Sequence, residues 1–267
     1  MKRIYITFSG ASYDVPTEKI VTDAPKFGAD EVVVYDDLWL TKQEFFTLNK
    51  WLWKHVGPGN PNGEHELEVS NTARGFGWFA WKPFCILDAL SKVNDGDVVL
   101  YTDGDTYPIA DLTCIFEHCK KLGGTMLFAA TGCKNQHWVK RDAFLVMSQD
   151  EPRYHEADHA VARFMLFEKG PWRNQQFLME WLTYCVNPTA TTFDESVLGP
   201  ELEGFKESRS EQAIFTLLAL KYGHKLHREA CQFGHTQPED QDIYPTLFHQ
   251  EGRKAAQTLE GSKFRNV

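Results

Sequence analysis

The stretch VVLYTDGDTYP, residues 98–108, carries an apolar run directly into two aspartates. The first four residues have the composition of a buried strand, and Asp103 and Asp105 follow it with only Gly104 between them. Side chains alternate along a strand, so both carboxylates are expected on one side, while Gly104 lets the backbone bend or a ligand approach. Like charges this close repel each other unless a cation lies between them. The stretch therefore predicts a Mg²⁺ or Mn²⁺ site at a strand end, although a solvated Asp-Gly turn is the commoner use of such a tripeptide.

Strand-like and helix-like segments alternate on both sides of this stretch. Strands are expected at 2–9, 31–35, 97–102, 125–130, 141–147 and 160–167. Helices are expected at 40–55, 83–93, 108–122, 171–184 and 211–222, the last with Ser210 as its N-cap, and a Gly- and Pro-rich loop at 55–68. This order predicts one α/β domain, with a mixed, mostly parallel central sheet flanked by helices. Ligands of such sheets bind beyond the carboxyl ends of the strands, where the two aspartates are expected.

The composition of the chain restricts its class. With 267 residues, 42% hydrophobic and 24% charged, the sequence is long enough for one large domain of ordinary globular composition. A net charge of -9 disfavours binding to nucleic acid. The sequence has no apolar run long enough for a membrane helix, and MKRIYITFSG is too weakly apolar for a signal peptide. Six cysteines without a CxxC pair suggest reduced thiols, so a cytoplasmic location is expected.

Two cations precede the acidic stretch. In RGFGWFAWKPFCILDAL, residues 74–90, Pro83 fits the first turn of a helix and places Lys82 at its N-terminus. Backbone amides and the helix dipole favour an anion there. Arg74, beside two glycines, adds a guanidinium nearby in sequence. These residues are candidates for binding a phosphate-containing ligand, although each taken alone is as often ordinary solvated surface.

The order of WKP, an amphipathic helix and GDVVLYTDGDTYP resembles nucleotide-sugar glycosyltransferases of the GT-A fold, a Rossmann-like fold. The bacterial and viral polysaccharide-type enzymes are the most similar. WVKRDAFLVM (138–147), FLMEWLTYC (177–185) and SRSEQAIFTLLALKYG (208–223) resemble further segments of these enzymes, in the same order. The chain departs from the family at two places: Glu211 stands where an aspartate is frequent, and TDGD stands where many relatives have SDAG.

The resemblance implies a function. It implies a glycosyltransferase domain over residues 1–250, which moves a hexose or pentose from a nucleotide-diphosphate sugar, a UDP-sugar being favoured, to a glycan or other hydroxyl acceptor in polysaccharide biosynthesis. It assigns Asp105 to direct contact with Mn²⁺ or Mg²⁺, and Asp103 to the metal and the ribose. Thr7, Phe8 and Ser9 would face the base and ribose, and the remaining donor-binding residues would be Gly104, Arg74 and Lys82.

The C-terminal sequence extends the resemblance. FHQEGRK, residues 248–254, is similar to the HxxGxxKPW ending of glycogenin-like transferases, which makes His249 the expected third metal ligand and Lys254 a diphosphate ligand. His235 competes with His249 for the metal. Residues 236–267 are expected to form a polar tail that wraps or frays, with 251–267 as a lid that orders on donor binding. Truncation after Pro245 is thus expected to lower turnover and leave the melting temperature nearly unchanged.

Glu211 and Gln212 open an expected helix and are the candidate catalytic residues. Glu211 is either a general base for an inverting reaction or a residue that holds the acceptor in a retaining one. Merely complementing the helix dipole is the structural alternative.

Two other functions compete. Residues 155–159 read HEADH, and on a helix His155 and His159 would hold zinc with Glu156 as the base of a metallopeptidase. The surrounding sequence is polar before the motif and strand-like after it, which favours a turn leading into a strand. A non-catalytic sugar- or nucleotide-binding module is the other alternative.

Overall fold

The computed structural model describes residues 1–9, 14–53, 76–236 and 243–251. At its centre lies a six-stranded sheet in the order β2-β1-β3-β6-β5-β7. The strands are β1 (Arg3–Ser9), β2 (Glu31–Asp36), β3 (Val98–Asp103), β5 (Thr125–Lys134), β6 (Asp158–Glu168) and β7 (Leu226–His227). β1 runs parallel to β2 and β3, and β5 to β7, whereas β6 is antiparallel to both of its neighbours. The predicted α/β fold with a mixed, mostly parallel sheet is confirmed.

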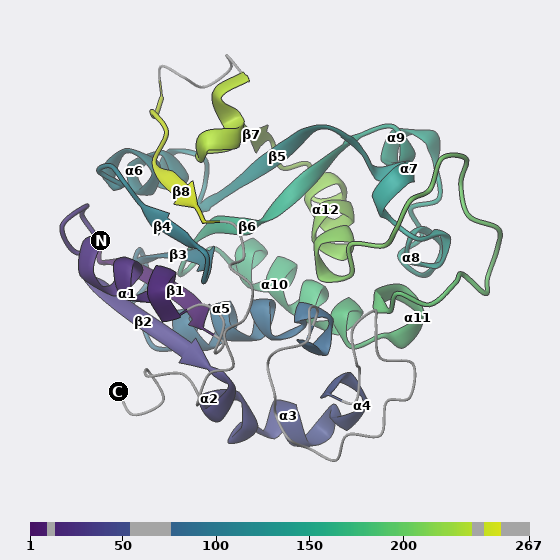
Figure 1. Cartoon of the computed structure of the whole chain (residues 1–267), viewed down its shortest axis with the longest axis horizontal. Helices are drawn as coiled ribbons and strands as arrows, with labels where there is room; N and C mark the ends of the chain where they lie inside the picture. Colours follow the sequence, from purple (N-terminus) through teal and green to yellow (C-terminus); the bar gives the residue numbers. More distant parts are fainter. Residues whose placement is uncertain (10–13, 54–75, 237–242, 252–267) are drawn as a thin grey trace.

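Helices cover both faces of this sheet (Figure 1). The longer ones are α1 (Asp14–Asp23), α5 (Trp81–Ser91), α6 (Thr113–Lys121), α10 (Trp172–Cys185) and α12 (Glu211–Lys221). Residues of α5, α10 and α12 share one core cluster with Ile4, Ile6 and Phe8 of β1. Residues of α1 and α6 share the other cluster with Tyr5. Successive side chains of a strand point to opposite faces, so the nearly continuous apolar run of β1 supplies both cores. No helix in the described ranges has the length and apolar character needed to span a membrane.

The short helices differ most from the sequence-based predictions. They are α2 (Asp37–Thr41), α3 (Glu44–Leu48), α4 (Lys50–Trp53), α7 (Asn135–Trp138), α8 (Arg141–Val146), α9 (Pro152–His155) and α11 (Pro188–Thr191), with the 3-10 turns η2 (Phe76–Phe79) and η3 (Gln232–Thr236). The strand expected at 141–147 is wrong, because this segment forms α8; an apolar run this short fits either structure. The single helix expected at 40–55 is three helices as far as Trp53, interrupted at Gln43 (φ -85°, ψ 144°) and at Asn49 (φ -112°, ψ 45°).

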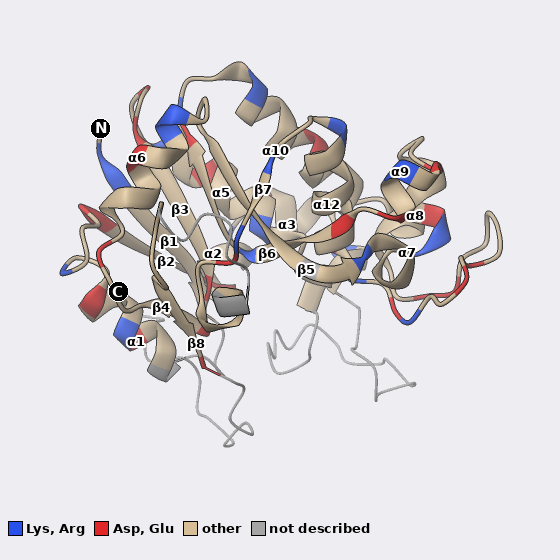
Figure 2. Ribbon diagram, turned by 90° about the horizontal axis from the view of Figure 1, so that it is seen from above, with Lys and Arg blue, Asp and Glu red and all other residues tan. Residues whose placement is uncertain are grey.

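A second, two-stranded sheet follows the acidic turn. β4 (Thr106–Pro108) pairs antiparallel with β8 (Phe248–Gln250), so the expected helix 108–122 begins only at Thr113. Figures 1 and 2 both show β4 and β8 side by side, with α1 next to them. Residues 248–250 thereby return to the segment that directly follows Asp105.

Residues 243–251 pack against the folded domain, so in this segment the expected tail wraps rather than frays, and its packed residues are apolar rather than polar. Tyr244, Leu247 and Phe248 are buried, and Phe248 stacks on Phe164 of β6 with ring centroids 5.2 Å apart. The hydroxyl of Tyr244 donates to the carbonyl oxygen of Arg228, whose guanidinium donates in return to the carbonyl of Tyr244. The apolar residues of YPTLF, 244–248, account for this packing, because they cannot be left in water without a cost.

Candidate functional site

The carboxyl ends of β1, β2 and β3 meet at one edge of the sheet. In the register of these strands Phe8 lies opposite Asp103, and Ser9 lies opposite Asp36. Asp103 is the last residue of β3, and a turn of Gly104 and Asp105 leads from it into β4. The acidic pair thus lies at the edge where ligands of such sheets bind.

Lys82, in the first turn of α5, links two carboxylates at this edge. Its Nζ lies 2.9 Å from Oδ1 of Asp103 and 2.9 Å from Oε1 of Glu211, and donates to the carbonyl of Ala162 at 3.1 Å. The residue is only 4% exposed, so all three ammonium hydrogens find acceptors inside the protein. Burial by itself lowers the pKa of Lys82, but Asp103 and Glu211 outweigh burial and raise it. Lys82 is therefore a buried cation held by two anions.

This arrangement differs from the role expected for Lys82. The sequence places it against a diphosphate, whereas the structure directs its donors to the end of β3, the start of α12 and the backbone of β6. A phosphate could approach Nζ only by displacing one of these acceptors. In the structure Lys82 serves to hold Asp103 and Glu211 together.

Asp103 and Asp105 have different partners. Oδ1 of Asp103 accepts a 2.8 Å hydrogen bond from the hydroxyl of Tyr101 in addition to its contact with Lys82. For Asp105 the partners are neutral: the hydroxyl of Thr106 donates to Oδ1 at 2.9 Å, and the amide of Gln250 donates to Oδ2 at 3.2 Å. Among the described residues, Asp105 forms no ion pair. Asp103 is thus paired with a lysine, whereas the hydrogen-bond donors to the Asp105 carboxylate are all neutral.

The electrostatics of Asp105 reflect its surroundings. Burial is the main reason why its pKa is raised, and the charge of Asp103 raises it further. The hydrogen bonds from Gln250 and Thr106 and the positive charge of Arg163 act in the opposite direction. A bound divalent cation would oppose both of the raising effects.

Arg163 and Gln250 were not identified as site residues from the sequence. Arg163 lies on β6, and its guanidinium Nη1 bonds Oε1 of Glu229 at 3.0 Å while its charge acts on Asp105. A basic residue inside the apolar run AVARFMLF was the signal that could have found it. No comparable signal marks Gln250, which reaches Asp105 only because β8 pairs with β4.

Glu211 and Gln212 begin α12, as predicted. Glu211 is 3% exposed, and its pKa is raised by burial, while Lys82 lowers it. Gln212 donates from its amide to the carbonyl of Ala160 at 2.9 Å. Ser210 occupies the N-cap position, but its side chain makes no capping hydrogen bond, and its backbone has a positive φ of 47°. Ser210 is thus the N-cap residue, as predicted, but it caps the helix without a side-chain hydrogen bond.

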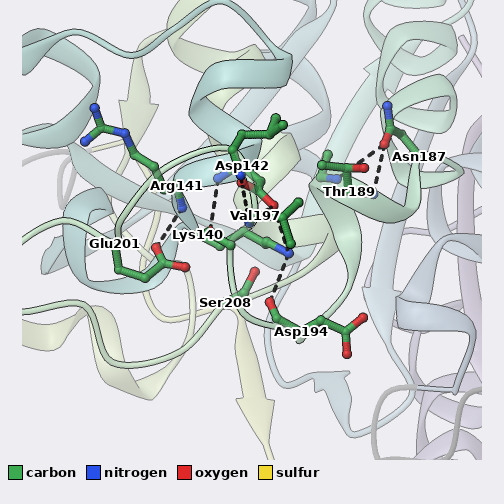
Figure 3. Close-up of polar contacts among 12 residues, drawn as sticks. Lys140, Arg141, Asp142, Asn187, Thr189, Asp194, Val197, Glu201 and Ser208 are labelled. Atoms are coloured by element: carbon green, nitrogen blue, oxygen red, sulfur yellow. Dashed lines mark hydrogen bonds and ion pairs between the residues drawn. The ribbon is translucent and has the colours of Figure 1, made fainter.

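The loop that leads into Glu211 is anchored on α8 (Figure 3). Asp142 accepts hydrogen bonds from the backbone amides of Val197 and Leu198, at 2.9 and 2.8 Å. Beside it the ammonium group of Lys140 donates to the carbonyl of Asp194 at 3.0 Å. Both anchoring side chains are buried. The segment before α12 is therefore held by Asp142, inside the expected strand 141–147, and by Lys140 directly before it.

The end of β1 lies beside the acidic pair, but its side chains make internal contacts. Thr7 donates to the carbonyl of Thr102 at 2.9 Å, and Ser9 accepts a 3.0 Å hydrogen bond from Thr17. Phe8 stacks on Trp81 with ring centroids 3.9 Å apart. Contact of Thr7, Phe8 and Ser9 with a base or ribose stays a prediction.

The expected third metal ligand lies next to the acidic turn without facing it. His249 pairs with Tyr107 across β4 and β8, and the two rings lie 5.4 Å apart. Successive residues of a strand point to opposite sides, and the next residue, Gln250, is the one that contacts Asp105. His235 lies in η3, but its side chain is outside the described part of the structure, as are Arg74 and Lys254.

The residues at this edge fit one kind of metal site. Within the described ranges, no three His, Cys, Asp or Glu side chains come together as a closed metal-binding cluster. Mg²⁺ and similar hard cations do not require one, because proteins commonly bind them through one or two carboxylates while substrate phosphates and water supply the other oxygens. Asp105, which forms no ion pair among the described residues and has neutral hydrogen-bond donors, suits such a site.

The HEADH segment does not form a metallopeptidase helix. His155 is the last residue of α9, whereas His159 lies in β6. Nε2 of His155 lies 2.9 Å from Oδ1 of Asp150, and Nδ1 of His159 lies 2.9 Å from Oδ1 of Asn135. Burial lowers the pKa of His159 to about 3, with a smaller effect of Arg209. The segment is a turn leading into a strand, as the sequence around it favoured, and the structure gives the peptidase no support.

Comparisons with known proteins give matches among solved structures only. The sequence matches no protein-family model and no curated protein. Apo mouse xyloside xylosyltransferase 1 is similar over 96% of this chain and 99% of its own length, with a TM-score of 0.45 and 11% identity. The apo bifunctional glycosyltransferase WbbM is similar over 81% of this chain and 37% of its own (TM-score 0.44, 12% identity). The apo glycosyltransferase GlyE of Streptococcus pneumoniae TIGR4 is similar over all of this chain and 59% of its own (TM-score 0.44, 12% identity).

Proposed function

We propose that this chain is a metal-dependent glycosyltransferase, which moves a sugar from a nucleotide-diphosphate sugar to a glycan or other hydroxyl acceptor. A UDP-sugar is the favoured donor. The observation that carries the proposal is that the two carboxylates at the end of β3 have different partners. Asp103 is bound to the buried Lys82, and Asp105 is held only by neutral donors. The motif order described above, from WKP to SRSEQ, agrees with this assignment.

Such a transfer requires positive charge near the donor diphosphate at this edge of the sheet. The bond from the anomeric carbon to the diphosphate breaks, and the leaving group gains negative charge. A Mn²⁺ or Mg²⁺ ion held by Asp105, with Asp103 beside it, would supply the compensating positive charge when bound. Arg163 adds a fixed positive charge near Asp105. Arg74 and Lys254 are the further cations that we propose for the diphosphate.

Lys82 prepares the site rather than binding the donor phosphates in this proposal. Its two ion pairs fix Asp103 and Glu211 relative to each other, although the two residues come from different elements. Because all three groups are already oriented inside the protein, they do not have to reorganise when charge develops on the substrate.

Glu211 and Gln212 are the residues proposed to meet the acceptor. In an inverting reaction Glu211 takes the proton of the acceptor hydroxyl, and the pKa raised by burial suits that task. Since Oε1 is bound to Lys82, the proton would be accepted at Oε2. In a retaining reaction the same carboxylate orients the acceptor. Gln212, tied to the backbone of β6 through its amide nitrogen, would offer its amide oxygen.

A donor screen tests the proposal. The protein is incubated with UDP-, GDP-, CMP- and dTDP-sugars and Mn²⁺, and nucleotide release is quantified. We expect release from one class of donor, and its loss in Asp105→Asn. Asp23→Asn, which changes a half-buried carboxylate of α1 paired with Lys26, is the matched control and should behave as the wild type. Full turnover by Asp105→Asn would refute the metal assignment, and donor binding without any release would indicate a non-catalytic binding module.

A further inference from the structure

Gln250 brings the C-terminal strand into contact with the acidic turn. Its side-chain nitrogen donates to Oδ2 of Asp105 at 3.2 Å, and the amide of Glu251 donates to the carbonyl oxygen of Asp105 at 2.9 Å. Asp105 is thus held by side chain and backbone from a segment far away in the sequence. Neither contact neutralises its charge, because both donors are uncharged.

The strand that carries Gln250 is itself fixed. The side chain of Gln232 donates to the carbonyl of Gln250 at 2.8 Å and accepts from its backbone amide at 3.0 Å. On the next residue, the carboxylate of Glu251 lies 3.3 Å from Nζ of Lys19 in α1. Phe248 anchors the other end of the strand in the core. These contacts fix the backbone of Gln250, so the fold determines where its side-chain amide lies.

We propose that Gln250 is a positioning residue for Asp105, which orients the carboxylate toward a divalent cation while leaving it fully charged. The inference rests on the function proposed above. Oδ1 is oriented by Thr106 and Oδ2 by Gln250, so rotation of the carboxylate breaks two hydrogen bonds. Each oxygen retains a lone pair for a metal. Partners of this kind, which orient a ligand without binding the metal, commonly contribute tenfold or more to metal affinity.

The contact also changes the expected role of the C-terminal segment. The sequence assigns its contribution to His249, whose ring lies against Tyr107. The structure assigns the contact with Asp105 to the neighbouring residue. The segment was thus correctly expected beside the acidic turn, whereas the side chain that reaches Asp105 is an amide.

Binding of Mn²⁺ alone tests the inference without any sugar nucleotide. Free Mn²⁺ is titrated by electron paramagnetic resonance in the wild type, Gln250→Met, Asp105→Asn and Gln176→Met. Methionine keeps the length and the apolar stem of glutamine but not the amide. We expect Gln250→Met to weaken Mn²⁺ binding roughly tenfold, whereas Gln176→Met, at an exposed glutamine of α10, leaves it unchanged. Wild-type affinity in Gln250→Met, combined with weak binding in Asp105→Asn, would overturn the positioning role and leave the metal site intact. Wild-type affinity in both variants would instead refute the proposed metal site itself.

A second variant separates positioning from a purely structural hydrogen bond. Gln250→Glu places another carboxylate against Asp105, and the two repel each other in the absence of a cation. We expect its melting temperature to fall in EDTA and to recover in Mn²⁺ by more than the wild type gains. An equal loss in both conditions would show that the amide serves only to hold β8 in place, and would overturn the inference. This arm also decides the matter if Gln250→Met fails to fold.

Discussion

The ammonium group of Lys82 lies 2.9 Å from Oε1 of Glu211, and both side chains are almost completely buried. The pair joins the first turn of α5 to the first turn of α12, and Asp103 completes it from the end of β3. The two carboxylates, of which Asp103 is partly exposed, outnumber the single ammonium group, and Asp105 lies two residues beyond Asp103. The excess of carboxylates at this edge of the sheet therefore favours binding of a cation.

Removal of Lys82 should destabilise the folded protein. Lys82→Met leaves Asp103 and Glu211 without their counter-ion in a buried site, and we expect the free energy of unfolding at pH 7 to fall by about 3–5 kcal/mol. The measurement is urea denaturation followed by circular dichroism. Glu211→Gln in the same chain should restore part of the loss, because it removes one of the uncompensated charges.

The pH dependence of this variant provides a further check. Burial and Asp103 already raise the pKa of Glu211 in the wild type, and Lys82 opposes this rise. Removal of Lys82 therefore raises that pKa further, so the folded variant binds a proton more readily than the folded wild type. Lowering the pH from 7 should therefore stabilise Lys82→Met relative to the wild type. A variant that is as stable as the wild type at pH 7, with the same pH profile, would contradict the buried-cluster interpretation.

His159 should make the wild-type protein sensitive to mild acid. Its pKa is about 3 in the folded state and about 6.5 in an unfolded chain, so below pH 6.5 only the unfolded state gains the proton. Stability is thus lost as the pH falls, by about 2 kcal/mol between pH 8 and pH 5. His159→Asn, which can still donate to Asn135, should lack this contribution in denaturation curves at the two pH values. Burial also lowers the pKa of His224, to about 4. Its contribution to the pH dependence of stability is the same in the wild type and in His159→Asn. Identical pH dependence in both would mean that His159 takes up a proton as readily in the folded protein as in the unfolded chain, and would contradict its lowered pKa.

The HEADH segment should be dispensable for sugar transfer. His155→Ala removes a 2.9 Å contact with Asp150, which also pairs with Arg141. We expect nucleotide release close to that of the wild type, and elemental analysis should find no stoichiometric zinc. One zinc per chain that disappears in His155→Ala would restore the metallopeptidase alternative.

The sheet was predictable because its signals are local. Continuous apolar runs such as 98–101 and 160–162 specify buried strands, and a strand ending in Asp103 places that residue at the carboxyl edge. The segment at 141–147 was mistaken for a strand because its apolar residues fit either period. Its helix is stabilised by tertiary contacts, among them the buried Asp142 that accepts amides of a distant loop.

The site itself was only partly predictable. The sequence singled out Lys82, Asp103 and Glu211, but did not pair them with one another, because their ion pairs depend on how α5 and α12 pack against the sheet. Gln250 carries no local signal at all. Its contact with Asp105 arises from the pairing of two three-residue strands, which no periodicity could reveal.

Two truncations should separate the packed C-terminal segment from the residues beyond it. Ending the chain after Pro245 removes Leu247 and Phe248, both fully buried, together with strand β8. Burial of each such side chain contributes about 1.5–3 kcal/mol, so we expect a loss of roughly 3–6 kcal/mol and a clear fall in melting temperature. This reverses the expectation from sequence alone, in which the same cut leaves the melting temperature unchanged.

Ending the chain after Glu251 instead keeps all the contacts of β8 and deletes residues 252–267. We expect this protein to melt within about 2 °C of the wild type, because the sequence predicts a polar tail for the deleted residues, and polar surface changes rarely alter stability by more than about 0.5 kcal/mol. Because Lys254 is removed, nucleotide release should nevertheless fall strongly if that lysine contacts the diphosphate. Calorimetry and the donor assay on both truncated proteins provide the two readouts. Normal release after the Glu251 cut would remove Lys254 from the proposed site, and an unchanged melting temperature after the Pro245 cut would contradict the packing of β8.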